Sequence, residues 1–137
     1  LDDVLVERAT RCPCGSEHLA LEHIEGREDD VIWLRDETGS RRSPVFADGL
    51  TRTILNADPC ITDYQVEQAG TDTLAIATEP AANDGQRQAI HAALEAFFSS
   101  LRIAMPDVVF RDMPAPAPAS KRRRVRGLAA RRERPDA

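Results

Sequence analysis

The sequence lacks the features of membrane-spanning and secreted proteins. It contains no apolar run of about eighteen residues, the length at which a helix can span a bilayer, so we expect no membrane partner. It shows no basic segment followed by an apolar one, the pattern of a secretory leader. Its three cysteines are an odd number, and two of them are separated by one residue, which does not favour a disulfide scaffold. We therefore expect a reducing, cytoplasmic location.

Positive charge is scarce along most of the chain and is concentrated near its end. Residues 121–137 hold 8 of the 18 Lys and Arg and 2 of the 23 Asp and Glu. Residues 1–120 have a formal net charge of −11. The basic segment has no aromatic residue beside it, although aromatic rings provide the stacking surface for single-stranded nucleic acids. Because the acidic remainder would also repel phosphates, we do not expect a nucleic acid partner. A solvated basic tail is the simplest interpretation of this segment.

Hydrophobic periodicity predicts an α+β fold. Apolar residues recur at helical spacing over residues 84–101 and predict a long helix that starts at Asn83 or Asp84. A shorter helix is expected over residues 49–56, with Asp48 as its N-cap. The expected strands cover residues 4–6, 19–24, 31–34, 44–46, 61–69, 74–77 and 108–110. We expect a small hairpin followed by a three-stranded sheet, with both helices packed on one face of that sheet.

Changes in composition predict three segments. Residues 1–25 form a connecting segment, residues 26–113 form the folded domain, and residues 114–137 form a linker and tail. Proline and alanine alternate over residues 114–119, which predicts an extended linker ahead of the basic residues. A chain of 137 residues is long enough for one domain with tails.

Two cysteines and two histidines near the beginning of the chain are candidate zinc ligands. Cys12, Cys14, His18 and His23 offer two thiolates and two imidazoles, which are the ligand types that zinc prefers. The Cys-x-Cys spacing is tighter than in the commoner zinc sites. Two free thiols at a tight turn are therefore the main interpretation, and zinc is the alternative.

The segment Gly-Arg-Glu-Asp-Asp at residues 26–30 precedes the apolar run at residues 31–34. Glycine lets the backbone turn or approach another group closely, and the guanidinium of Arg27 is suited to oxyanions. Taken alone, the pattern is that of a charged turn before a strand.

The same segment resembles the hinge motif of adenylate-forming enzymes, in which a large nucleotide-binding domain joins a small C-terminal domain. Leu-Asp-Asp-Val at residues 1–4, Arg-Cys-Pro-Cys-Gly at residues 11–15 and Asp-Tyr-Gln-Val at residues 63–66 resemble the phenylacetate–CoA ligase branch and its capsule-biosynthesis-type relatives. Gly39 and Pro44 fit the same pattern. The resemblance covers roughly residues 1–125.

The resemblance implies roles for individual residues. Asp3 corresponds to the family aspartate that binds the ribose hydroxyls, and Arg27 corresponds to the arginine that contacts the nucleotide near the domain junction. Asp29 corresponds to the hinge residue, whose backbone torsions change as the small domain turns from an adenylation pose to a thiol-transfer pose. Lys121 corresponds to the late catalytic lysine, with Ser120 in the place of the usual glycine.

By this resemblance, the chain is expected to be the C-terminal lid domain of an ATP-dependent ligase. Such a ligase activates a carboxylic acid as acyl-AMP and transfers it to CoA, so ATP/AMP, Mg and CoA are the implied cofactors. The implied partner is a preceding N-terminal adenylation domain, without which we expect no activity. Two alternatives from other classes stay open: a non-catalytic interaction module with a basic tail, and a small zinc-binding protein.

Overall fold

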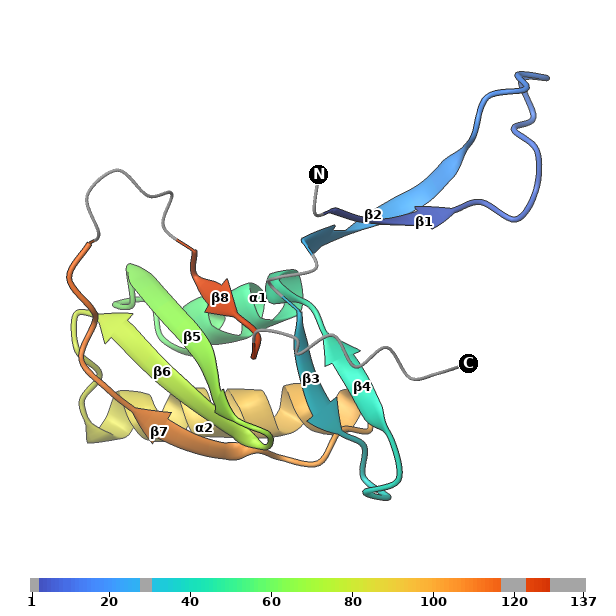
Figure 1. Cartoon of the computed structure of the whole chain (residues 1–137). Helices are drawn as coiled ribbons and strands as arrows, with labels where there is room; N and C mark the ends of the chain where they lie inside the picture. The colour runs from blue at the N-terminus through green and yellow to red at the C-terminus, as the bar shows by residue number, and fades with distance from the viewer. Residues whose placement is uncertain (1–2, 28–30, 117–122, 129–137) are drawn as a thin grey trace.

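The computed structural model describes residues 3–27, 31–116 and 123–128, and it confirms a mixed α+β fold (Figure 1). In chain order the elements are β1 (Asp3–Glu7), β2 (Leu21–Arg27), β3 (Ile32–Arg35), β4 (Arg42–Val45), α1 (Ala47–Ala57), β5 (Asp63–Gly70), β6 (Thr73–Glu79), α2 (Asp84–Ser100), β7 (Asp107–Phe110) and β8 (Val125–Arg126). Within the described ranges, neither helix combines the length and the apolar character needed to cross a bilayer.

Strands β1 and β2 form an antiparallel hairpin. Figure 1 shows this hairpin projecting away from the other elements. Its long connection, residues 8–20, contains the cysteine turn. The strands expected over residues 4–6 and 19–24 are thus confirmed as a pair, with β2 beginning at Leu21.

Strands β3 and β4 form a second antiparallel hairpin. Its turn contains Gly39 at a φ of +72°, a left-handed conformation that glycine adopts without a steric penalty. The carboxylate of Asp36 accepts hydrogen bonds from the Thr38 hydroxyl at 2.7 Å and from the Ser40 N–H at 3.1 Å. These bonds, with that from Thr38 the strongest, hold the pKa of Asp36 below its ordinary value. The turn expected around Gly39 is therefore well defined.

The main sheet has the strand order β7-β6-β5-β8. β5 and β6 are antiparallel, whereas β7 and β8 each run parallel to the neighbouring strand. The expected sheet of three strands was one strand short, because β8 comes from the basic segment that was interpreted as a tail. Val125 is buried against the sheet with 3% of its surface exposed, and the Val66 N–H donates to the Arg124 carbonyl at 2.7 Å. The buried Val125 and the edge of β5 are therefore enough to add a strand that hydrophobic periodicity in the sequence does not predict.

The two helices begin in different ways. At α2, the Asn83 side chain accepts from the Gln86 N–H at 2.9 Å and the Gln86 side chain accepts from the Asn83 N–H at 3.0 Å, which is a capping box. This confirms the expected start of the long helix. At α1, Phe46 occupies the N-cap without a side-chain capping bond, so Asp48 is not the N-cap. Asp48 lies in the first turn, where it pairs with Arg52 at 3.2 Å.

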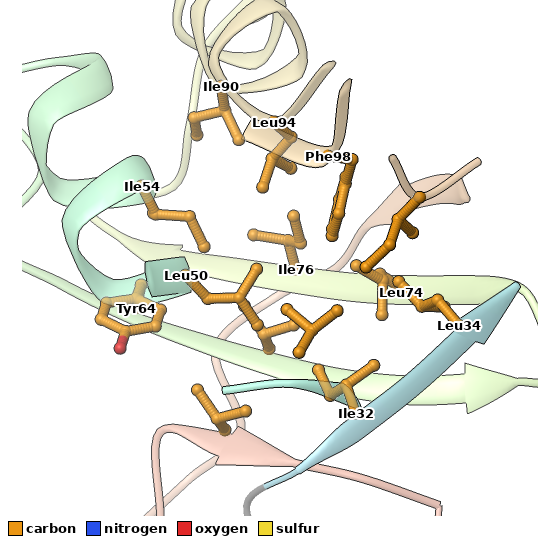
Figure 2. Packing of buried hydrophobic residues seen from close by; sticks show 14 of the residues in the cluster. Ile32, Leu34, Leu50, Ile54, Tyr64, Leu74, Ile76, Ile90, Leu94 and Phe98 are labelled. Carbon is orange, nitrogen blue, oxygen red and sulfur yellow. The ribbon is translucent and has the colours of Figure 1, made fainter. Parts of the chain in front are cut away.

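One hydrophobic core joins the helices, the main sheet and the β3–β4 hairpin. Figure 2 shows the α2 and α1 side chains directed toward the strands; they are Ile90, Leu94, Phe98, Leu50 and Ile54. The helices approach closely at Gly49, where an added Cβ would lie 2.6 Å from the Phe97 Cζ. The core therefore packs the helices against the main sheet, in which one edge of β5 pairs with β8.

Candidate functional site

Two of the residues predicted to contact a nucleotide lie opposite each other. Asp3 and Arg27 are register partners at one end of the β1–β2 hairpin. Asp3 is the first residue of β1 and Arg27 is the last residue of β2. The backbone pairing thus brings a carboxylate-bearing and a guanidinium-bearing residue to one place, directly before the segment at residues 28–30.

The other two predicted residues lie outside the described residues. Asp29 falls between β2 and β3, and Lys121 falls between β7 and β8. The structure nevertheless defines the elements on both sides of each residue. On the C-terminal side of Lys121, the structure describes the segment that begins at Arg123 and pairs with β5.

Residues 123–128 are attached to the main sheet by a group of contacts that we call the C-terminal anchor; on the sheet side it comprises Asp63, Gln65, Val66 and Gln68. Its ion pair joins Arg124 Nε to Asp63 Oδ1 at 2.9 Å. The hydrogen bond to Asp63, together with the carboxylate charge, raises the pKa of Arg124. Arg124 is thereby held at the strand edge on both its backbone and its side chain.

Gln65 is a buried polar member of the C-terminal anchor, with 3% of its surface exposed. Its Nε2 donates to the Arg123 carbonyl at 3.3 Å, and its Oε1 accepts from Arg111 Nη2 at 3.3 Å. The same Arg111 nitrogen contacts Glu67 Oε2 at 2.7 Å. Because a buried amide is costly unless it is hydrogen-bonded, these contacts favour one position for residue 123.

Gln68 connects three parts of the chain through one amide. Its Nε2 donates to the carbonyls of Trp33 at 2.9 Å and Thr71 at 3.2 Å. Its Oε1 accepts from the N–H groups of Trp33 at 3.3 Å and Leu128 at 3.4 Å. The side chain is 3% exposed and has all four of its hydrogen-bonding positions in use. It therefore links the β3–β4 hairpin to the end of the C-terminal segment.

Sequence reasoning placed neither glutamine at a site. Gln65 was expected on the polar face of β5, and that face is covered where Arg111 and the C-terminal segment lie. Gln68 shared its face with the apolar residues Tyr64 and Val66, and a glutamine at a core-facing position is the signal that could have found it. The buried amides mark where a distant segment binds the strand.

The four candidate zinc ligands are only partly brought together. Cys14 Sγ and Cys12 Sγ are 3.0 Å apart, and both thiols are free. His18 is exposed in the same connection, and His23 belongs to β2, where only its backbone is described. Among the described residues, no three His, Cys, Asp or Glu side chains form a group that could hold a metal ion. Within this connection, the structure places two free thiols side by side.

Comparison with known proteins shows that this chain is similar to solved structures. No protein-family model matches the sequence, and no curated protein matches it. Solved structures of 2-hydroxyisobutyryl-CoA ligase do match. The ligase in the postadenylation state, in complex with R3-HIB-AMP, aligns with a TM-score of 0.50 and 17% identity over 95% of this chain and 28% of that chain. An open conformation in complex with 2-HIB-AMP and CoA aligns with a TM-score of 0.45 and 14% identity, over 94% of this chain and 28% of that chain.

At this level of identity, the likeness concerns the fold. Nearly all of this chain is similar to a part of an acid–CoA ligase, and it spans 28% of that ligase's length. The class that the structure defines is thus an α+β domain of the kind found within such a ligase. One protein that displays this fold is 2-hydroxyisobutyryl-CoA ligase, in its postadenylation state with R3-HIB-AMP.

Proposed function

We propose that this chain is the C-terminal lid domain of an ATP-dependent, adenylate-forming ligase of the phenylacetate–CoA ligase type. The observation that carries the proposal is the fold likeness over 95% of this chain to 28% of 2-hydroxyisobutyryl-CoA ligase. The order of motifs supports it, because the Gly-Arg-Glu-Asp-Asp segment lies at the junction of the β1–β2 and β3–β4 hairpins. A preceding adenylation domain would supply the remainder of the active site.

The reaction has two steps with different demands. In the first, a carboxylate oxygen attacks the α-phosphorus of ATP, an acyl-AMP forms and pyrophosphate leaves. In the second, a thiol such as that of CoA attacks the acyl carbon and AMP leaves. The first step brings two anions together, so it needs a cation directed at the phosphate and groups that hold the ribose. A domain that turns between the steps can supply different residues to each.

The residues at the end of the β1–β2 hairpin fit the nucleotide. A carboxylate at Asp3 can accept hydrogen bonds from ribose hydroxyls, and a guanidinium at Arg27 can donate to phosphate oxygens. Their register pairing places both at one end of the hairpin. Asp29 follows Arg27 by two residues and would be the hinge, so this nucleotide contact and the hinge would be close together in the sequence.

Lys121 would be the cation of the adenylation step. It lies two residues before Arg123, where the C-terminal anchor begins. The anchor would confine the lysine to the region near the β5 edge, which reduces the conformational freedom that must be lost when its ammonium meets the phosphate. Asp63 and Gln65 would then act as positioning residues for Lys121.

The exposed apolar side chains of the β1–β2 hairpin agree with a protein partner. Leu5, Leu19 and Leu21 are 50%, 69% and 40% exposed. In the proposed ligase they would face the adenylation domain; in a non-catalytic interaction module they would face another protein. The reading frame upstream of Leu1 separates these functions, since only the ligase requires an adenylation domain there.

The decisive experiment uses the protein encoded by the complete reading frame. Pyrophosphate release is measured with ATP and a panel of carboxylic acids, and thiol transfer is measured separately from a pre-made acyl-adenylate. We expect Lys121→Ala to slow adenylation by roughly two to three decades and thiol transfer far less, because a transition-state contact is lost. Arg132→Ala removes another basic residue of the same C-terminal segment, far from Lys121 in the sequence, and serves as the control for loss of a positive charge. Absence of pyrophosphate release from the parent with every acid would contradict the proposed function.

A further inference from the structure

The Cys12-Pro13-Cys14 turn is a second chemical site that the proposed ligase reaction does not use. Its two sulfur atoms are 3.0 Å apart. The turn is closed by a hydrogen bond from the Gly15 N–H to the Cys12 carbonyl at 3.1 Å, and Gly15 has a φ of +80°. Pro13 has a fixed φ, so the backbone between the cysteines has little freedom to separate them.

Both thiols can be reached by a small molecule. Cys14 is exposed and Cys12 is partly exposed, in the connection of a hairpin that projects from the body (Figure 1). Buried structural cysteines are inert, whereas reactive ones lie in accessible surroundings. Cys60 is also exposed and free, but it lies after α1, far from the turn in the sequence. The described chain thus has one accessible pair of thiols, Cys12 and Cys14, and one accessible single thiol, Cys60.

The hydrogen bonds of the turn favour the thiolate at Cys14. The bond with the Cys12 thiol, followed by a bond to the backbone of Ser16, lowers the pKa of Cys14. In the neutral pair Cys14 donates to Cys12; once Cys14 has lost its proton, the Cys12 S–H can donate to the Cys14 thiolate. Since the thiolate is the nucleophile of thiol chemistry, Cys14 is the better attacking group and Cys12 is placed beside it.

We propose that Cys12 and Cys14 form a reversible dithiol–disulfide site that reacts with small-molecule disulfides. The Cys14 thiolate attacks one sulfur of the small disulfide, a mixed disulfide forms and one small thiolate leaves. Cys12 then loses its proton and attacks Cys14 Sγ, so the Cys12–Cys14 bond forms and the second small thiolate leaves. One disulfide is consumed, one is made and two small thiols are released, so no other oxidant is needed. Closure requires the sulfurs to approach from 3.0 Å to about 2.05 Å.

The test treats the full chain with oxidised glutathione, blocks remaining thiols with an alkylating reagent and maps tryptic peptides by mass spectrometry. Cleavage after Arg11 and Arg27 places Cys12 and Cys14 on one peptide and Cys60 on another. We expect the first peptide to lose the mass of two hydrogens and to take up neither glutathione nor alkyl group. Cys60 should carry glutathione or the alkyl group, and a reducing agent should restore both thiols of the turn.

Two variants distinguish the roles within the pair. Cys12→Ser should accumulate a stable mixed disulfide at Cys14, because the resolving thiol is absent. Cys14→Ser should leave Cys12 reacting more slowly than Cys14 does in Cys12→Ser. A parent peptide that carries two glutathione or two alkyl groups, or a Cys12–Cys60 cross-link, would overturn the proposal. None of these measurements depends on ligase activity, so this site and the proposed function can fail independently.

Discussion

Asp63 and Arg124 are 61 residues apart in the sequence and share a hydrogen-bonded ion pair of 2.9 Å at the edge of the main sheet. The pair joins the first residue of β5 to the residue that precedes β8. It connects the folded body to the segment in which the proposed catalytic lysine lies. In the proposed function, this surface interaction would help to position Lys121.

Asp63→Asn should loosen the C-terminal segment more than it destabilises the protein. The side chains of Arg124 and Asp63 are 59% and 21% exposed, so solvent screening limits the loss of unfolding free energy to about 1 kcal/mol or less. Hydrogen exchange of the Val66 N–H should be faster, because that group donates to the Arg124 carbonyl. Asp48→Asn breaks the similar pair with Arg52 on α1 and should leave Val66 exchange unchanged. Equal exchange in both variants would mean that the pair does not hold β8.

Leu94→Ala should lower the free energy of unfolding by about 2–5 kcal/mol, because Leu94 is 0% exposed in the core and its loss leaves a cavity. Glu95→Ala changes the next residue of α2, which is exposed, and should alter stability by about 0.5 kcal/mol or less. Denaturant unfolding of both variants measures the difference. If Leu94→Ala were as stable as Glu95→Ala, α2 could not be packed as Figure 2 shows.

Tyr64 should ionise only at unusually high pH. It is the single tyrosine of the chain and is 1% exposed. Burial raises its pKa, and the hydrogen bond with Thr51 offsets part of that effect. Because the folded pKa exceeds the unfolded value of about 10, this contribution to stability is fully present below that value and is lost as pH rises through the folded pKa.

The ultraviolet absorbance of tyrosinate reports on Tyr64 alone, so titrations with and without denaturant give the two pKa values directly. We expect the native midpoint to be the higher one. Tyr64→Phe should abolish the signal and serves as the control. A native midpoint equal to the denatured one would show that the phenol is open to solvent.

Asp29→Pro tests the proposed hinge in the protein encoded by the complete reading frame. Proline fixes φ near −65° and removes the N–H, so it should trap one pose of the lid. One half-reaction should persist near the parental rate while the other decreases steeply, and Asp29→Ala should affect both only mildly. Paired single-turnover rates, with a thermal melt as control, measure this. Parallel losses in both steps, accompanied by a lower melting temperature, would identify residues 26–30 as an ordinary charged turn.

The sequence predicted the elements that depend on residues close together in the sequence. The helical spacing of Ile90, Leu94 and Phe98 identified α2, and the turn at residues 70–72 identified the β5–β6 hairpin. It could not predict β8, because two residues with one buried valine have no periodicity. The start of α1 was misassigned because an acidic residue is favourable both at the N-cap and in the first turn.

For the candidate site, the sequence identified individual residues, but it did not identify the glutamines that attach the C-terminal segment to the main sheet. Asp3 and Arg27 were named separately, and only the hairpin register shows that they are opposite each other. Gln65 and Gln68 bind backbone groups far away in the chain, and such contacts depend on tertiary structure. The roles of Asp29 and Lys121 stay predictions, since both residues lie outside the described residues.

The parallel pairing of β8 with β5 has a consequence for synthesis on the ribosome. Of the described strands, β8 is made last, so β5 has an unpaired edge until residue 126 has left the exit tunnel. An open edge can pair with another chain, which is a common start of aggregation. Polypeptides that stop before β8 would keep that edge permanently, with the amides of Gln65 and Gln68 deprived of their C-terminal partners. Protection of this edge of the sheet therefore depends on the synthesis of β8.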